Sequence, residues 1–204
     1  MIAEQGIEKL TYRNLAKKVG ITEPAFYRHF SSKTEIMFGI LVYFDGIRRE
    51  LFTRIRASST SSLSAIESII LEHFELFEKN PALAMILFPE AIRQNREELD
   101  GKVLEMMKTG QENIVAIITE GMERGEIRDD IDKQQLALMI SGTLRLLVTR
   151  WQLKKYNGDL QEQGRRFWQD LSRLIRSEDW TQSKNENEEE YRNTQEDRQS
   201  GRDE

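Results

Sequence analysis

The sequence predicts an all-α protein. Apolar residues recur at helical spacing almost throughout, and no segment alternates apolar and polar residues as a half-buried strand does. Only three prolines occur in 204 residues, which also suits long helices. We expect a small N-terminal pair of short helices, then a larger helical bundle, then a polar C-terminal segment.

The N-terminal helices are delimited by clear boundary signals. A short helix over about 11–19 ends at Gly20, a residue typical of helix C-termini. A second helix begins after Thr22 as its N-cap, with Pro24 tolerated in its first turn. The segment Ser32-Lys-Thr-Glu35 reads as a capping box that starts a third helix, which runs to about residue 57.

The rest of the chain reads as further helices. A serine-rich loop over 58–62 precedes a helix whose apolar face spans about 66–77. Pro81 opens the next helix, to about residue 95, with a kink at Pro89. We expect three more helices: one over about 98–123 that ends before Gly125, one from the Asp132 cap to the break at Asn157-Gly158, and a last one from a capping box at Asp159 to about Ile175.

Composition excludes several classes of site. The chain has no cysteine, so it has no disulfide, no thiolate metal site and no cysteine nucleophile. It has two histidines, too few for a multi-histidine metal centre, and we predict neither a metal nor a cofactor. The longest apolar run, Ala82 to Phe88, is far shorter than the roughly 20 residues that span a bilayer. The N-terminus does not resemble a secretory signal, so we expect a cytoplasmic protein with no membrane partner.

Charge is distributed unevenly along the chain. The formal net charge is 30 − 35 = −5. Residues 180–204 hold eight acids and four bases and only two large apolar residues, which predicts a disordered acidic tail. The first 33 residues hold six bases and three acids, a net +3. Because the local sign of charge governs nucleic-acid binding, the N-terminal end is a candidate DNA-binding region.

The segment Thr11 to Phe30 fits a helix-turn-helix. Gly20 lies in the turn between two short helices, and Ala16 is small where the second helix crosses the first. The apolar residues that would face each other across the turn are Leu15, Val19, Ile21 and Phe26. In such a motif the second helix presents its N-terminal half to the major groove. The competing interpretation is an ordinary corner of two packed helices.

The outward residues of the second helix suit DNA. Arg28 can bind guanine through two hydrogen bonds, and Thr22 and Tyr27 can contact phosphate or base edges. Ala25 is small enough to touch a thymine methyl group, and Lys33 can reach phosphate. Two alternatives stay open: Tyr27 could pack in a core, and His29 could be a structural histidine.

Several strings in this region resemble the DNA-binding domain of TetR/AcrR-type transcriptional regulators. The matching strings are Thr11-Tyr-Arg13, Leu15-Ala16, Gly20-Ile-Thr, Pro24-Ala-Phe-Tyr27 and His29-Phe-Ser-Ser-Lys33. The resemblance covers about residues 1–45. It implies that the following residues fall where the family places DNA contacts: Tyr12, Arg13, Thr22, Glu23, Ala25, Tyr27, Arg28, His29 and Lys33.

The N-terminal end departs from this family. The family packs a further full helix in front of the motif, whereas only Met1 to Gln5 precede Gly6 here. Ile2 and Ala3 match the end of such a helix. We therefore expect that the translated start lies upstream of Met1 or that the chain is truncated.

The resemblance implies three parts: a helix-turn-helix DNA-binding domain over 1–45, an effector-binding and dimerisation domain over 46–179, and the tail over 180–204. A small, apolar effector would enter the bundle, although each candidate residue taken singly fits plain core better than a pocket wall. The candidate pocket residues are Phe44, Phe52, Phe74, Phe77, Met85, Phe88, Met107, Ile114, Ile118 and Trp151. His73, beside this apolar face, fits a buried or rim histidine better than a ligand contact.

The last two helices carry broad apolar stripes that predict a homodimer interface. The alternative is that the stripes face only their own domain. The candidate interface residues are Leu136, Met139, Ile140, Thr143 and Leu147 on one helix and Phe167, Trp168, Leu171, Leu174 and Ile175 on the other.

These features predict a ligand-responsive repressor that binds a pseudo-palindromic operator as a dimer. Its partners would be double-stranded DNA, a second copy of the chain and a small-molecule effector. An enzyme is disfavoured because no nucleophile, phosphate loop or paired-carboxylate motif is evident. A second alternative is a nucleoid-associated or interaction protein of the same fold that acts without an effector.

Overall fold

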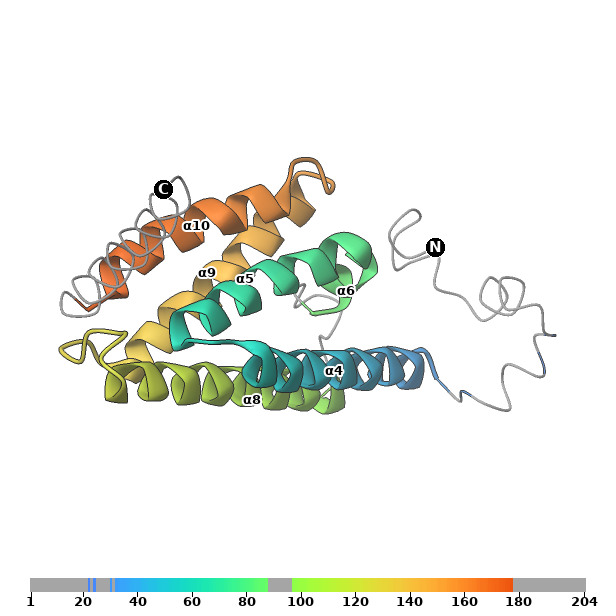
Figure 1. Ribbon diagram of the computed structural model, residues 1–204. Helices are drawn as coiled ribbons and strands as arrows, with labels where there is room; N and C mark the ends of the chain where they lie inside the picture. Colours follow the sequence, from blue (N-terminus) through green and yellow to red (C-terminus); the bar gives the residue numbers. More distant parts are fainter. Residues whose placement is uncertain (1–21, 23, 25–29, 31, 88–96, 178–204) are drawn as a thin grey trace, which may run out of the picture.

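Six α-helices follow one another in the part of the chain that the computed structural model describes, which comprises residues 22, 24, 30, 32–87 and 97–177 (Figure 1). The helices are α4 (Lys33–Ser58), α5 (Ser62–Lys79), α6 (Pro81–Leu87), α8 (Glu97–Glu123), α9 (Lys133–Leu153) and α10 (Leu160–Ile175). The all-α class predicted from the sequence is confirmed, and the predicted helices at 11–19 and after Thr22 lie outside the described residues apart from residues 22, 24 and 30.

Three predicted N-caps are confirmed. Each cap side chain accepts a hydrogen bond from a backbone N–H of the first turn, which would otherwise lack a helical partner. The bonds run from the Glu35 N–H to Ser32 Oγ at 3.0 Å, from the Gln135 N–H to Asp132 Oδ1 at 2.8 Å, and from the Glu162 N–H to Asp159 Oδ1 at 2.6 Å.

Helix α5 begins earlier than its apolar pattern predicts. Ser61 and Ser64 form a reciprocal capping box, in which each side chain accepts from the other residue's backbone N–H at 3.1 Å. The predicted serine-rich loop is therefore present as residues 59–61 between α4 and α5, and its last residue caps α5. Gly125 and Gly158 have φ values of 68° and 104°, a left-handed region that suits glycine where α8 ends and where the chain turns into α10.

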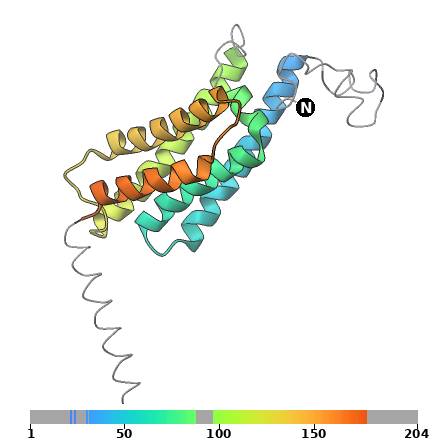
Figure 2. The ribbon, with the colours of Figure 1, turned by 90° about the horizontal axis from the view of Figure 1, so that it is seen from above.

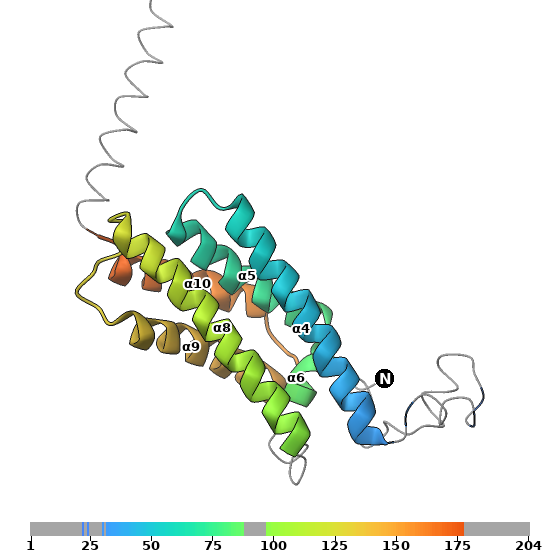
Figure 3. The same cartoon turned by 90° about the horizontal axis from the view of Figure 1, so that it is seen from below.

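Helix α5 lies at the centre of the bundle and packs against α4, α6, α8, α9 and α10. Figures 1 and 3 show α4 and α8 side by side on one side of α5, with α10 on the opposite side. Figure 2 shows α9 and α10 next to each other. Helix α5 contributes aromatic and β-branched side chains to the core: Ile70, Phe74 and Phe77 are fully buried. Burial of such side chains is the main favourable contribution to folding.

Two glutamates cap the N-termini of helices to which they do not belong. Glu126 is buried and Glu78 is half-buried. Glu126 Oε2 accepts hydrogen bonds from the backbone N–H groups of Ser62 (2.6 Å) and Leu63 (3.4 Å) at the start of α5. Glu78 Oε1 accepts from the N–H of Leu160 at 2.7 Å at the start of α10. A carboxylate at a helix N-terminus is favoured by the helix dipole, so these contacts fix where α5 and α10 begin.

No helix among the described residues is both long enough and apolar enough to cross a membrane.

Gly164 allows α10 to approach α5 closely. A Cβ atom at this position would lie 2.4 Å from Phe74 Cδ2, and Phe74 is itself fully buried. By contrast, a Cβ at Gly101 in α8 meets nothing within 4 Å.

We predict that Gly164→Ala lowers the free energy of unfolding by about 1–3 kcal/mol, because the added methyl group overpacks a rigid aromatic contact. Gly101→Ala is the matched control and should be neutral or stabilising by about 0.5–1 kcal/mol, since alanine favours a helix. Chemical denaturation of the three proteins measures both. Equal effects of the two substitutions would contradict the close approach.

Candidate functional site

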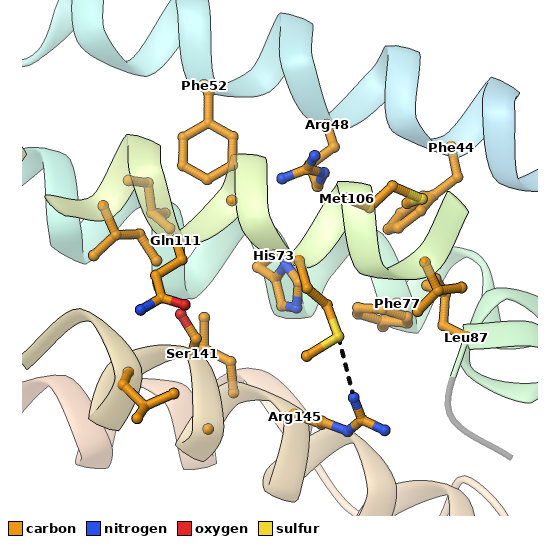
Figure 4. Close-up of a pocket in the computed structure, with 18 residues that line it drawn as sticks. Phe44, Arg48, Phe52, His73, Phe77, Leu87, Met106, Gln111, Ser141 and Arg145 are labelled. Carbon is orange, nitrogen blue, oxygen red and sulfur yellow. Dashed lines mark hydrogen bonds between the residues drawn. The ribbon is translucent and has the colours of Figure 1, made fainter. Parts of the chain in front are cut away.

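A cavity of about 370 Å³ lies between helices α4, α5, α8 and α9, with Leu87 of α6 at one end (Figure 4). Most of its lining is apolar, with aromatic rings from α4 and α5 facing methionines of α8. Met107 and Leu138 are half exposed, so the cavity opens to the surface between α8 and α9. This size and lining fit a site for a small apolar molecule.

Five of the ten predicted pocket residues line this cavity: Phe44, Phe52, Phe77, Met107 and Ile114. They come from α4, α5 and α8, which the fold brings together although the chain separates them by up to 70 positions. Their spacing explains the agreement, since Phe44 and Phe52 lie on one face of α4 two turns apart. The side chains of Met85 and Phe88 lie outside the described residues.

Three of the predicted pocket residues do not line this cavity. Phe74 is fully buried on the α10 side of α5, against Gly164. Ile118 is fully buried in the core, one turn beyond the lining residue Ile114. Trp151 donates its indole N–H to the Gly158 carbonyl at 3.1 Å, which directs it toward the turn before α10.

The sequence interpretation missed the polar residues of the lining, which are Arg48, His73, Gln111, Ser141 and Arg145. A positional signal exists for two of them. Arg48 lies four residues from both Phe44 and Phe52, and His73 lies four residues before Phe77, so each shares a helix face with lining aromatics.

The buried carboxylate of Asp45 organises one wall of the cavity. It accepts hydrogen bonds from Arg48 Nη2 (2.7 Å) and Arg49 Nε (3.1 Å) on α4, and from Lys102 Nζ (3.0 Å) on α8. Arg49 and Lys102 also pair with Glu105, at 3.2 and 3.0 Å. These ion pairs join α4 to α8 directly beside the cavity.

Electrostatics keep Asp45 ionised. Burial by itself would raise the pKa of its carboxyl group, but the hydrogen bonds from Arg48, Lys102 and Arg49 outweigh burial and lower the pKa from 3.8 to about 2. Asp45 is therefore a fixed negative charge at any physiological pH, and it holds the three cations in place.

His73 is neutral at physiological pH. Burial disfavours its charged form, and the nearby positive charge of Arg48 disfavours it further, so its pKa falls from 6.5 to about 4. Its ring packs edge-on against Phe77, with the ring centres 4.9 Å apart. His73 thus presents a neutral imidazole at the cavity wall (Figure 4).

The predicted dimer residues divide into two sets. The first set packs in the core of its own chain and comprises Leu136, Ile140, Trp168, Leu171 and Ile175. The apolar stripe on each helix is wide, so some of its residues pack in the core and others lie at the surface. The second set lies at or near the surface. Met139 and Leu174 are exposed, and the half-buried members are Thr143, Leu147 and Phe167. Exposed Leu146 and Leu153 extend this surface and were missed.

Two of the nine predicted DNA contacts fall within the described residues. Thr22 is exposed, and Lys33 is half-buried at the first residue of α4. The other seven lie outside the described residues: Tyr12, Arg13, Glu23, Ala25, Tyr27, Arg28 and His29. Among the residues that the structure describes, no three His, Asp or Glu side chains are grouped so as to hold a metal ion.

Two protein-family models match successive parts of the chain. Residues 1–40 match the family described as bacterial regulatory proteins, tetR family. Residues 46–173 match the family described as YsiA-like protein, C-terminal region.

Individual relatives have regulatory names. The fatty acid metabolism regulator protein of Bacillus subtilis is 29% identical over 161 residues, which are 78% of this chain and 82% of that protein. The structure of the transcriptional regulator FadR from Bacillus subtilis in complex with stearoyl-CoA aligns with a TM-score of 0.70 and 25% identity, over 84% of this chain and 91% of that one. The nucleoid occlusion factor SlmA of Mannheimia succiniciproducens is 36% identical over 104 residues, 50% of this chain and 47% of that protein.

The shifted pKa of His73 predicts a pH dependence of stability. Between pH 6.5 and 4 the unfolded chain binds a proton at this histidine and the folded chain does not. The free energy of unfolding should therefore fall as pH drops through this window, by up to about 3 kcal/mol. Denaturant titrations at several pH values measure this, and His73→Gln should remove most of the slope. An imidazole signal of His73 titrating near 6.5 in NMR spectra would contradict the prediction.

Proposed function

The chain belongs to the TetR family of bacterial regulatory proteins, and from this premise we propose that it is a transcriptional repressor released from DNA when a small molecule with an apolar chain occupies the cavity. The observation that carries the proposal is the position of that cavity. One of its walls is α4, the helix that begins within the matched segment 1–40 and continues into the bundle.

The proposed effector has an acyl chain. The cavity wall is mostly aromatic rings, aliphatic groups and methionine, which suit a flexible apolar chain. A similar protein is named for fatty acid metabolism, and a similar structure contains stearoyl-CoA. These relatives support an acyl compound as the effector class for this chain.

The proposed DNA contact is the helix-turn-helix within a domain over residues 1–45. Its second helix would insert into the major groove, with Arg28 reading a base and Lys33 contacting phosphate. Two such domains in a symmetric dimer would bind half-sites about 34–36 Å apart, so the operator would be a pseudo-palindrome. A protein that binds the bacterial chromosome in this way would act in the cytoplasm.

The proposed effector and dimerisation domain spans residues 46–179, before the acidic tail over 180–204. Met139, Leu146 and Leu174 are exposed on two neighbouring helices, α9 and α10. Exposed apolar side chains on adjacent helices support a helix-to-helix interface with a second copy of the chain.

The proposed switch acts through α4. Occupation of the cavity would displace α4 relative to α8 and change the separation of the two recognition helices. A hundredfold preference of the effector for the released state corresponds to about 2.7 kcal/mol of coupling. No catalytic step is part of this proposal.

A second candidate function is that of a nucleoid-associated factor, which the similarity to SlmA favours. Such a protein would bind dispersed chromosomal sites and would need no effector. Chromatin immunoprecipitation separates the two: a few promoter sites support the repressor, and dispersed sites support the second candidate.

The direct test is release from operator DNA. We expect at least one of decanoate, decanoyl-CoA and stearoyl-CoA to lower the affinity of the protein for its operator at least tenfold, measured by fluorescence anisotropy. Gly110→Leu, which would fill the cavity next to Arg48, should retain DNA binding and lose the response. Failure of every acyl compound to change the affinity would overturn the proposal.

Substitution of Arg28 and of Lys33 by alanine should affect DNA binding differently. We predict that Arg28→Ala costs about 1–3 kcal/mol and relaxes the preference for one base pair, because Arg28 reads a base. Lys33→Ala should weaken binding to all sequences alike and reduce the salt dependence by about one unit of slope. Binding titrations on operator and scrambled DNA at several salt concentrations measure both effects. A sequence-selective loss in Lys33→Ala would contradict its phosphate role.

A charged residue at the proposed subunit interface should separate the dimer. We predict that Leu174→Glu weakens dimerisation at least tenfold, about 1.4 kcal/mol, because a carboxylate would have to be buried without a partner. Leu104→Glu, at an equally exposed leucine on α8, is the control and should leave the dimer intact. Sedimentation equilibrium measures both variants, and an unchanged dimer in Leu174→Glu would exclude this surface.

A further inference from the structure

One polar atom of the cavity wall has no hydrogen-bond partner among the described residues: Nε of Arg48. The arginine side chain is 8% exposed, so solvent does not provide a full substitute. A buried N–H group without an acceptor is costly and rare in native structures. Figure 4 shows the guanidinium group reaching from α4 toward the middle of the cavity lining.

The guanidinium group is held in position on its other sides. Nη2 donates to Asp45 Oδ1 at 2.7 Å, and the guanidinium carbon lies 5.8 Å from the ring centre of Phe52. Gly110 on α8 leaves the space for Nη1, since a Cβ there would lie 2.8 Å from it. The Nε–H group is thus a fixed donor for which the described residues supply no acceptor.

The charges around Arg48 leave an excess of one positive charge. The cluster contains three cations, Arg48, Arg49 and Lys102, and two carboxylates, Asp45 and Glu105, a formal total of +1. His73 is neutral and does not change this balance. A ligand that enters this cavity therefore meets an apolar wall with a buried, positively charged donor.

We propose that Arg48 recognises the head group of the effector and that the effector is an amphipathic carboxylate, which pairs with the guanidinium group of Arg48 while its apolar chain packs against Phe44, Phe77 and Ile114. This inference rests on the proposed function and names the chemical class of effector for the same cavity. A carboxylate both accepts hydrogen bonds from the guanidinium group and neutralises the excess charge, whereas an alcohol or an ester does only the first.

The experiment compares three ligands with the same chain: decanoate, methyl decanoate and 1-decanol, each below its aggregation concentration. Isothermal titration calorimetry on the full chain measures their affinities at neutral pH. We expect decanoate to bind at least about tenfold more tightly than the other two, the usual advantage of a charge-assisted hydrogen bond.

Arg48→Gln should abolish this preference while 1-decanol still binds, because the apolar wall stays in place. Arg54→Gln is the matched control: Arg54 lies on the same helix but pairs with Glu72 on the surface, so its loss should leave the preference unchanged. Retained binding of 1-decanol shows that the cavity of the variant is folded.

If Arg48→Gln does not fold, the double variant Asp45→Asn/Arg48→Gln replaces the ion pair by a neutral amide pair of similar shape and tests the same point. Equal affinities of decanoate and 1-decanol for the unmodified protein, or a preference that survives loss of Arg48, would overturn the carboxylate assignment. Operator release by an acyl-CoA without any carboxylate preference would refute this inference alone. Tight decanoate binding without release of DNA by any ligand would instead refute the proposed switch.

Discussion

The arrangement of the cavity depends on one buried carboxylate. Asp45 accepts hydrogen bonds from two arginines of its own helix and from Lys102 of α8, and it is 4% exposed. A buried ion pair is weak support for stability, because desolvation offsets much of its attraction. Its effect here is positional: it fixes α4 against α8 and fixes the guanidinium group of Arg48 beside the cavity. Without the Asp45 carboxylate, Arg48, Arg49 and Lys102 would lose the acceptor that they share.

The same few helices form the cavity and the proposed subunit contact. Helix α9 lines the cavity through Leu138, Ser141 and Arg145, and it exposes Met139 and Leu146 on its outer side. Helix α4 lines the opposite side of the cavity and begins within the matched N-terminal segment. A ligand in this space therefore contacts both the helix that leads to DNA and the helix proposed to contact the second subunit. Packed helices have discrete arrangements, which allows a small molecule to favour one of them.

The sequence predicted much of this fold, because local signals set helix boundaries. Ser32, Asp132 and Asp159 cap the helices that they were expected to cap. The aromatic residues proposed for a pocket include Phe44, Phe52 and Phe77, which line one cavity. Apolar periodicity does not separate the two sides of a broad stripe: Leu136 is buried and Met139 is exposed, three residues apart. Arg48 shares a helix face with Phe44 and Phe52, but its contact with Gly110 of α8, some 60 positions along the chain, has no local signal in the sequence.

The central claim is that occupation of the cavity moves α4. The chain has no cysteine, so Gly39→Cys, at an exposed position of α4 where a Cβ meets nothing within 4 Å, gives one labelling site per subunit. Pulsed electron-spin distance measurement between the two labels of a dimer then reports the separation of the two α4 helices. A distance distribution that shifts when an acyl ligand is added, in parallel with DNA release, is the predicted result. Release of DNA with an unchanged distance distribution would contradict it.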